Sequence, residues 1–240
     1  MSEMDTRTRI LNAAFEVITR NGYAGAGIAE IIKSSGMTRG AVYHHFASKE
    51  EIGRAVVREV ILERYAQYWR RAFEAAYATP AAGDRQTAAK KNGGRGASDS
   101  VLEALIAGLK NTKLLNCNNG CSLTNVHQSV NSTNDPRLAE TVREAQSSFE
   151  AIFIDAIRLA VDRHEFSDPA GVDPQILGAF IAAAFQGAMG AAGVEGGPSK
   201  YLRLIGELER YLRGLANPRA GTSTGRPATP NAAAARKKSS

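Results

Sequence analysis

The sequence predicts an all-α protein. Apolar residues recur at three- and four-residue spacings along most of the chain, as they do on one face of an α-helix. Capping residues, prolines and glycines separate these segments in the order that starts and stops helices. No segment carries the strict alternation of a half-buried strand. With 240 residues, of which 43% are hydrophobic and 22% charged, the chain can build one large domain or two smaller ones.

The first fifty residues predict three short helices followed by the start of a longer one. The first helix is expected to begin with a cap at Asp5 or Thr6 and to end at Asn21-Gly22. A second apolar face covers 28–32 and stops at the Ser-Ser-Gly run of 34–36. The apolar face of the first helix is formed by Ile10, Ala13, Ala14, Val17 and Ile18.

Two capping signals define the next elements. Thr38 is expected to cap a third helix that runs to about His45. Ser48, with Glu51 three residues later, forms the pattern of a capping box, so a fourth helix should run from there into the 70s.

The rest of the chain predicts further helices separated by loops. The small, polar, glycine-rich stretch 79–99 predicts a mobile loop. A helix is expected from about Ser100, fading in the Asn/Gly cluster at 116–120. Asp135-Pro136, Asp173-Pro174 and Pro198 each open another helix, the last ending near Leu215. The segment 216–240 is basic, has no apolar face and is expected to be disordered.

The first three predicted helices, with a tight turn between the second and third, form a helix-turn-helix pattern. Val42 and Phe46 are four residues apart and should face the core, which turns the opposite face of the third helix outward. Arg39 near the helix start could pair with guanine or bind phosphate. Tyr43 and His44 could donate to phosphate oxygens, and Lys49 on the first turn of the fourth helix adds positive charge. The candidate contacts to double-stranded DNA are Thr38, Arg39, Gly40, Ala41, Tyr43, His44 and Lys49.

Residues 10–52, and GMTRGAVYHHFASKE within them above all, resemble the N-terminal domain of the TetR family of transcriptional regulators (TetR/AcrR type). The resemblance implies an all-helical homodimer that binds a palindromic operator and is released by a small-molecule effector. It implies a DNA-binding domain over 1–52 and an effector-binding and dimerisation domain over 53–215, before the basic tail. One departure is Ala26, where the family commonly has a Thr or Ser that caps the second helix; Gly27 offers no side-chain cap either.

The helices over 174–194 and 198–215 correspond in position to the family's last two helices, which pair in a four-helix bundle between subunits. Small residues of the first, such as Gly187 and Gly190, would let helices approach closely. Aromatic residues at four-residue spacing on the fourth helix favour a core, and the resemblance adds the alternative of a pocket for a mainly apolar effector. The candidate pocket residues are Tyr65, Trp69, Phe73, Phe149, Phe153, Phe180 and Phe185.

Cys117 and Cys121 leave an alternative open, that of a regulator sensing redox state, electrophiles or metal. A Cys-x3-Cys-x5-His set lacks an evident fourth ligand, so we predict no metal and no cofactor. A small helical enzyme is a further alternative, but the sequence has no paired carboxylates, phosphate loop or CxxC motif that would support one. Gln186 and many small residues interrupt the apolar run 176–194, which favours a buried helix over a membrane span. We therefore expect a cytoplasmic protein.

Overall fold

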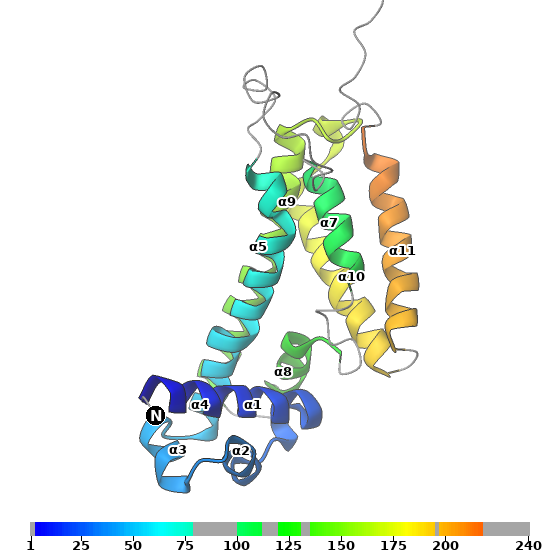
Figure 1. The fold of residues 1–240 in the computed structure, drawn as a ribbon. Coiled ribbons are helices and arrows are strands. Elements are labelled where there is room, and N and C mark those ends of the chain that lie inside the picture. The colour runs from blue at the N-terminus through cyan, green and yellow to red at the C-terminus, as the bar shows by residue number, and fades with distance from the viewer. Residues whose placement is uncertain (1–2, 79–99, 112–119, 131–134, 195–196, 218–240) are drawn as a thin grey trace, which may run out of the picture.

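A computed structural model describes residues 3–78, 100–111, 120–130, 135–194 and 197–217 of the chain (Figure 1). These residues form helices joined by short connections, and their only strand-like feature is one isolated bridge between Phe166 and Ala216. The predicted fold class is therefore confirmed for the described part of the chain. The main helices are α1 (Glu3–Gly25), α2 (Ile28–Ser35), α3 (Arg39–His45), α4 (Lys49–Ala55), α5 (Leu62–Ala78), α7 (Val101–Lys110), α8 (Ser122–Val130), α9 (Pro136–Asp162), α10 (Pro174–Val194) and α11 (Gly197–Leu215).

Helices α1, α2 and α3 gather at one end of the molecule, the lower end in Figure 1. Helix α1 begins earlier than expected, but its regular part does end where the Asn-Gly pair predicted, because Gly22 has a φ of 69° and a ψ of 163°. Gly36 takes a left-handed conformation, with φ 65°, and makes the tight turn between α2 and α3. Buried side chains of all three helices, including Ile10, Ile31 and Val42, share one core.

A single helical rod leads away from this end. Helix α4 continues without a break into η1 (Val56–Ile61), a π-helical segment, and then into α5. The capping box that predicted its start is present: Ser48 Oγ accepts a hydrogen bond from the Glu51 amide at 3.3 Å. The Glu51 carboxylate accepts one from the Ala47 amide at 2.7 Å. The sequence predicted the continuous helix, but the π-helical segment within it was not anticipated.

The remaining helices pack around α9 and α10, which lie along one another for much of their length (Figure 1). Gly178 makes this close approach possible, because a Cβ there would lie 2.6 Å from the backbone of Ile154. Helix α10 is long and apolar enough to cross a membrane, but that property is weak evidence here. Its buried residues face α9 and α11, and its Gln186 exchanges hydrogen bonds with Gln146 of α9.

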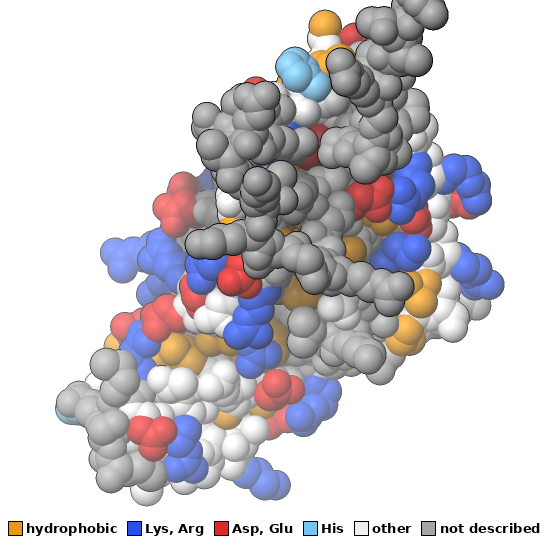
Figure 2. Space-filling model, turned by 45° about the horizontal axis from the view of Figure 1, so that its top comes forward, with side chains coloured by type: hydrophobic (Ala, Val, Ile, Leu, Met, Phe, Trp, Pro, Cys, Tyr) orange, Lys and Arg blue, Asp and Glu red, His pale blue; other side chains and the backbone are white. Residues whose placement is uncertain are grey.

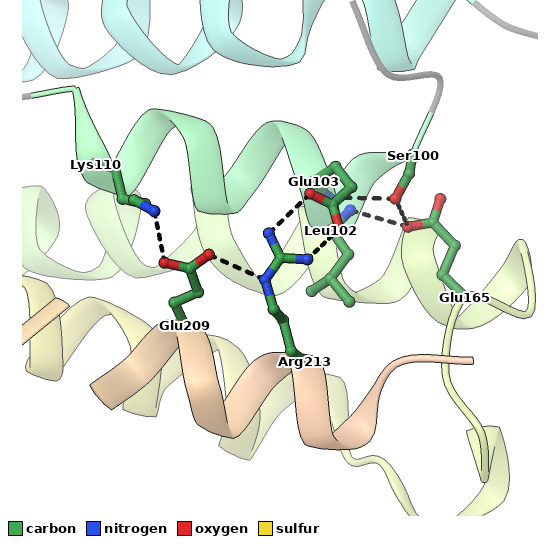
Figure 3. A network of polar contacts seen from close by, with 7 residues as sticks. All are labelled: Ser100, Leu102, Glu103, Lys110, Glu165, Glu209 and Arg213. Carbon is green, nitrogen blue, oxygen red and sulfur yellow. Dashed lines mark hydrogen bonds and ion pairs between the residues drawn. The ribbon is translucent and has the colours of Figure 1, made fainter. Parts of the chain in front are cut away.

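A polar network holds α7 and α11 together at the other end of the molecule (Figure 3). Glu209 of α11 accepts hydrogen bonds from Lys110 at 2.7 Å and from Arg213 at 2.9 Å. Arg213 also donates to both carboxylate oxygens of Glu103. Next to it, the buried carboxylate of Glu165 accepts hydrogen bonds from the first residues of α7.

Helix α8 differs from the predicted organisation, and some of the predicted segments lie outside the described residues. Helix α8 was not predicted, because it is short and follows the Asn/Gly cluster that ordinarily ends a helix. The expected loop over 79–99 and almost all of the expected tail lie outside the described residues, as does Cys117.

Candidate nucleic-acid interface

Helix α3 is a short, well-capped helix. Thr38 is its N-cap, and its Oγ1 accepts a hydrogen bond from the Ala41 amide at 3.2 Å, as the sequence predicted. Val42 and Phe46 are completely buried, which anchors one face of the helix to α1 and α2. The seven-residue helix therefore depends on its cap and on these two contacts, since a helix this short has little stability of its own.

The opposite face of α3 is exposed to solvent. Arg39, Gly40, Tyr43 and His44 all lie there, and Tyr43 has 39% of its surface accessible. The Arg39 guanidinium lies 5.4 Å from the centre of the Tyr43 ring, a cation–π contact between neighbouring turns. The rings of His44 and His45 meet edge to face, with centroids 5.3 Å apart. These side chains form a polar, donor-rich surface on the helix.

Gly40 is not required by the packing of the chain. A Cβ built at this position would have no heavy atom within 4 Å, and its φ is not in the left-handed region. The glycine instead leaves the backbone beside Ala41, which is half-buried, open to close approach from outside. A surface that lets another molecule reach the backbone is what a base edge or a thymine methyl would need.

Lys49 lies differently from the expectation. Its Nζ donates to the carbonyl oxygen of Ala24 at 3.1 Å and lies 4.8 Å from the centre of the Tyr23 ring. Burial lowers the pKa of this lysine, with a smaller opposing effect of Glu50. The side chain is thus folded onto the end of α1, whose carbonyls attract a cation, and it does not point freely from α4. The contact of Lys49 with phosphate stays a prediction, and it requires the ammonium group to leave the Ala24 carbonyl.

The start of α2 has no side-chain cap, as the sequence predicted. The N-cap is Gly27, in an extended conformation and with no side-chain hydrogen bond, while Ala26 is fully buried in the core. The position that commonly carries Thr or Ser in the resembled family therefore packs inward here. Only backbone N–H groups are available at the start of this helix.

The predicted aromatic pocket is a filled core. Trp69, Phe73, Phe149, Phe153 and Phe185 have at most 1% of their surface exposed and pack ring against ring, with the centroids of Trp69 and Phe153 4.9 Å apart. Dense packing of this kind leaves no space for an effector among these rings. The sequence left two alternatives for these aromatic residues, a core or an effector pocket, and the geometry supports the core.

Phe180 lies apart from that core. It is 51% exposed on the outer face of α10 and meets Tyr211 of α11, with ring centroids 5.8 Å apart. Its assignment to the pocket is wrong because α10 is apolar on several faces, so its sequence does not tell which face turns inward.

A pocket does exist, beside α1. It has a volume of about 140 Å³ and opens between α1 and the η1–α5 junction, with the start of α8 and one residue of α10 closing it. Only Tyr65 of the predicted pocket residues lines it. Thr19 was not among the predicted pocket residues, although a polar residue one turn after Phe15 on an otherwise apolar helix face indicates such a position. The lining residues are Phe15, Glu16, Thr19, Ile61, Arg64, Tyr65, Tyr68, Gly120, Ser122 and Met189.

The described cysteine, Cys121, is fully buried, and its Sγ lies 3.3 Å from the Tyr65 hydroxyl oxygen. Within the residues that the structure describes, no three His, Cys, Asp or Glu side chains are placed to hold a metal ion. Neither finding tests the thiol alternative, which also depends on Cys117.

Comparison with known proteins gives the N-terminal part a family. Residues 10–56 match the family model of bacterial regulatory proteins of the tetR family. The transcriptional regulator UidR of Escherichia coli K12 is 48% identical over 52 residues, which is 22% of this chain and 26% of UidR. The transcriptional repressor NemR of the same strain is 36% identical over 74 residues, 30% of this chain and 35% of NemR. The alignments thus span about a quarter to a third of these relatives.

Solved structures share the fold over most of the chain. The crystal structure of reduced E. coli NemR has a TM-score of 0.66 at 18% identity and covers 92% of this chain and 100% of its own. A TetR regulatory protein from Rhodobacter sphaeroides has a TM-score of 0.68 at 20% identity, covering 85% and 97%. Residues 10–56, which include the exposed helix α3, thus match the DNA-binding domain of the tetR family of bacterial transcriptional regulators, and the described chain shares the fold of solved TetR-family regulators.

Proposed function

We propose that the chain is a homodimeric repressor that binds a palindromic DNA operator and leaves it when a small, mainly apolar effector binds. The observation that carries the proposal is the outer face of α3. It presents Arg39, Gly40, Tyr43 and His44 to solvent from a helix whose inner face is locked into the core. A cytoplasmic location follows from this role, because the operator is there.

In the proposed complex, α3 enters the major groove with its N-terminal end toward the bases. Arg39 is free of acidic partners among the described side chains, and its fork of donors matches O6 and N7 of guanine. Tyr43 and His44 lie one turn farther along, where their donors reach phosphate oxygens. Lys49 joins them only after leaving the Ala24 carbonyl, so DNA has to replace a hydrogen bond that already exists.

The dimer is supported by the large apolar side chains that α10 and α11 leave exposed, because clusters of such side chains mark sites of association. Ile176 is 69% exposed and Phe180 51%. Gly187 and Ala183 lie on this outer face of α10 as well, where small residues let a second helix approach closely. Figure 2 shows acidic and basic side chains interspersed along the edge that α11 forms, as at a polar rim. The large exposed apolar residues of the two helices are Ile176, Phe180, Val194, Leu202, Leu204 and Tyr211.

Two-fold symmetry is what would make this dimer useful. A pair of α3 helices in successive major grooves lies about 34–36 Å apart, which demands a palindromic site. The relative named a repressor, NemR, supports repression as the output.

The experiment is selection of bound duplexes from a random pool of about 30 bp, followed by fluorescence anisotropy with the selected site. We expect a palindrome, one dimer per site or more, and affinity that falls steeply with salt. The variant Arg39→Ala should lose about 1–3 kcal/mol of binding and relax specificity at one base position of each half-site.

The matched control is Arg158→Ala, which removes an exposed arginine of α9 that pairs with Asp155 in the preceding turn. It should leave operator binding unchanged. Binding that shows no preference among duplex sequences would overturn the proposal, and so would equal losses in the two variants.

A further inference from the structure

We infer that the pocket beside α1 is a binding site for a small neutral aromatic molecule with one hydrogen-bonding group, and that Thr19 recognises that group. The pocket would be the site of the effector, so its effect on DNA binding rests on the proposed function. The site lies at the junction of α1 with α5, away from the filled aromatic core.

The observation that points to a ligand is an unpartnered hydroxyl. Thr19 is 8% exposed, lines the pocket, and its Oγ1 is buried without a hydrogen-bond partner in the described structure. A buried hydroxyl left without a partner is costly, so such groups are almost always satisfied in folded proteins. A molecule in the pocket with a donor or an acceptor would satisfy it.

The two tyrosine hydroxyls of the pocket are already engaged. The Tyr68 hydroxyl donates to the carbonyl of Gly108, and the Tyr65 hydroxyl oxygen lies 3.3 Å from Cys121 Sγ. Thr19 therefore offers a ligand a buried hydroxyl without a partner, whereas Ser122, the other hydroxyl of the lining, is only half-buried. The surfaces around it are apolar, from Ile61 and Met189.

The size and charge of the pocket define the class of ligand. A volume of about 140 Å³ is close to that of cavities which hold a single benzene ring. The charged lining residues, Glu16 and Arg64, are both exposed and stand at the mouth with opposite charges. The Arg64 guanidinium is stacked 4.0 Å from the centre of the Phe15 ring and donates to Asn12. A balanced pair of charges at the mouth, one of them already engaged, favours a neutral ligand over an ion.

The position of the pocket links it to α3. Its walls come from α1 on one side and from η1, α5, α8 and α10 on the other. Helix α1 packs against α2, α3 and α4, so any shift of α1 relative to α5 is passed to α3. A ring bound between these walls fixes the position of α1 relative to α5, and with it holds α3 out of register with its partner in the dimer. The operator affinity at saturating ligand should then fall by about 5- to 100-fold, the usual range of coupling between two sites.

The first experiment measures binding without DNA, on the full chain, with phenol and toluene as probes. The two molecules have nearly the same shape, but only phenol can form a hydrogen bond with the hydroxyl of Thr19. Because so few atoms make contact, we expect a phenol dissociation constant of about 0.1–1 mM by ligand-observed NMR. Toluene should bind less tightly than phenol.

The variant Thr19→Val keeps the shape of the side chain and removes its hydroxyl. It should weaken phenol binding by about three- to tenfold, leave toluene unchanged, and have a Tm equal to or above that of the parent chain, since it removes an unsatisfied group. The matched control is Thr141→Val, a buried threonine of α9 whose Oγ1 already donates to the Arg137 carbonyl. It should leave binding of both probes unchanged.

The outcomes separate this inference from the proposed function. Absence of phenol binding, equal phenol affinity in Thr19→Val and the parent, or a lower Tm in Thr19→Val would each overturn the site. Phenol that binds through Thr19 but leaves operator affinity unchanged would overturn its regulatory role. A chain that selects no DNA sequence refutes the proposed function, while the DNA-free titrations still decide whether the pocket binds its ligand.

Discussion

The carboxylate of Glu165 should be among the most important polar groups for the stability of the helices around α9, and Glu165→Gln tests this. The residue is 6% exposed and lies just beyond the end of α9. Its Oε1 accepts from the Val101 amide at 3.0 Å, and its Oε2 accepts from the Leu102 amide at 2.9 Å and the Ser100 hydroxyl at 2.8 Å. One side chain thus satisfies the first N–H groups of α7 (Figure 3).

The magnitude follows from these three bonds. A hydrogen bond to a charged group contributes about 1.5–3 kcal/mol to stability and a neutral one about half as much. Gln keeps one acceptor oxygen but turns an NH2 group toward the N–H groups of α7, so at least one bond is lost and the others weaken. The favourable interaction of the negative charge with the helix start, about 0.3–1 kcal/mol, also disappears. Because contributions within one network are not additive, we expect the variant to lose about 2–4 kcal/mol of unfolding free energy in total.

The assay is urea unfolding followed by circular dichroism at one fixed protein concentration, because dimerisation would otherwise shift the midpoint. Amide hydrogen exchange of residues 101–104 should accelerate more than that of α9. The matched control is Glu140→Gln, which replaces an exposed carboxylate paired with Arg143 one turn away and should cost less than about 0.5 kcal/mol. Equal costs in the two variants would refute the reasoning, because the effect would then belong to the lost charge and not to the buried cap.

Three further predictions concern packing, assembly and pH. Gly178→Ala places a Cβ 2.6 Å from the backbone of α9, so thermal unfolding should show a loss of about 1–3 kcal/mol; an unchanged Tm would contradict the close contact. Phe180→Asp puts a charge on the exposed face of α10 and should shift the chain to monomer in analytical ultracentrifugation, without loss of helical signal; a dimer that persists would exclude this face. Hydrogen bonds from Lys110 and Arg213 lower the pKa of Glu209 in the folded chain below its ordinary value of 4.5. The stability that the Glu209 carboxylate contributes is therefore fully present above about pH 4.5 and is lost as the pH falls through the pKa of the folded state. Glu209→Gln should therefore reduce stability by about 0.5–1 kcal/mol near pH 7 and by less in acid, and a constant difference across the pH range would contradict the pairing.

The helix-turn-helix was predictable in detail because its determinants are close together in sequence. Thr38 caps α3 through an amide three residues away, and Gly36 supplies the left-handed turn that L residues avoid. Val42 and Phe46 face inward because they are one helical turn apart. Each of these features depends on a few neighbouring residues.

Three features that were not predicted from the sequence depend on distant contacts. Lys49 bonds to Ala24, 25 residues earlier in the chain, and nothing around Lys49 indicates this. Phe180 turns outward because α9 takes the other face of α10, and the apolar sequence of α10 does not distinguish the two faces. The partnerless hydroxyl of Thr19 exists only because α5 and α10 close over α1.

The sequence by itself determined that the chain is helical, where α3 and α4 begin, and which residues α3 presents to solvent, since local hydrogen bonding and a period of 3.6 residues decide those properties. Only the tertiary structure decided that the aromatic stripe of α5 is a filled core, that the pocket lies beside α1, and which face of α10 remains open for a second copy. The physical reason is that helix faces pack against one another nonlocally: two helices that are each amphipathic or apolar can meet in several ways, and the space left between them depends on every side chain at the contact.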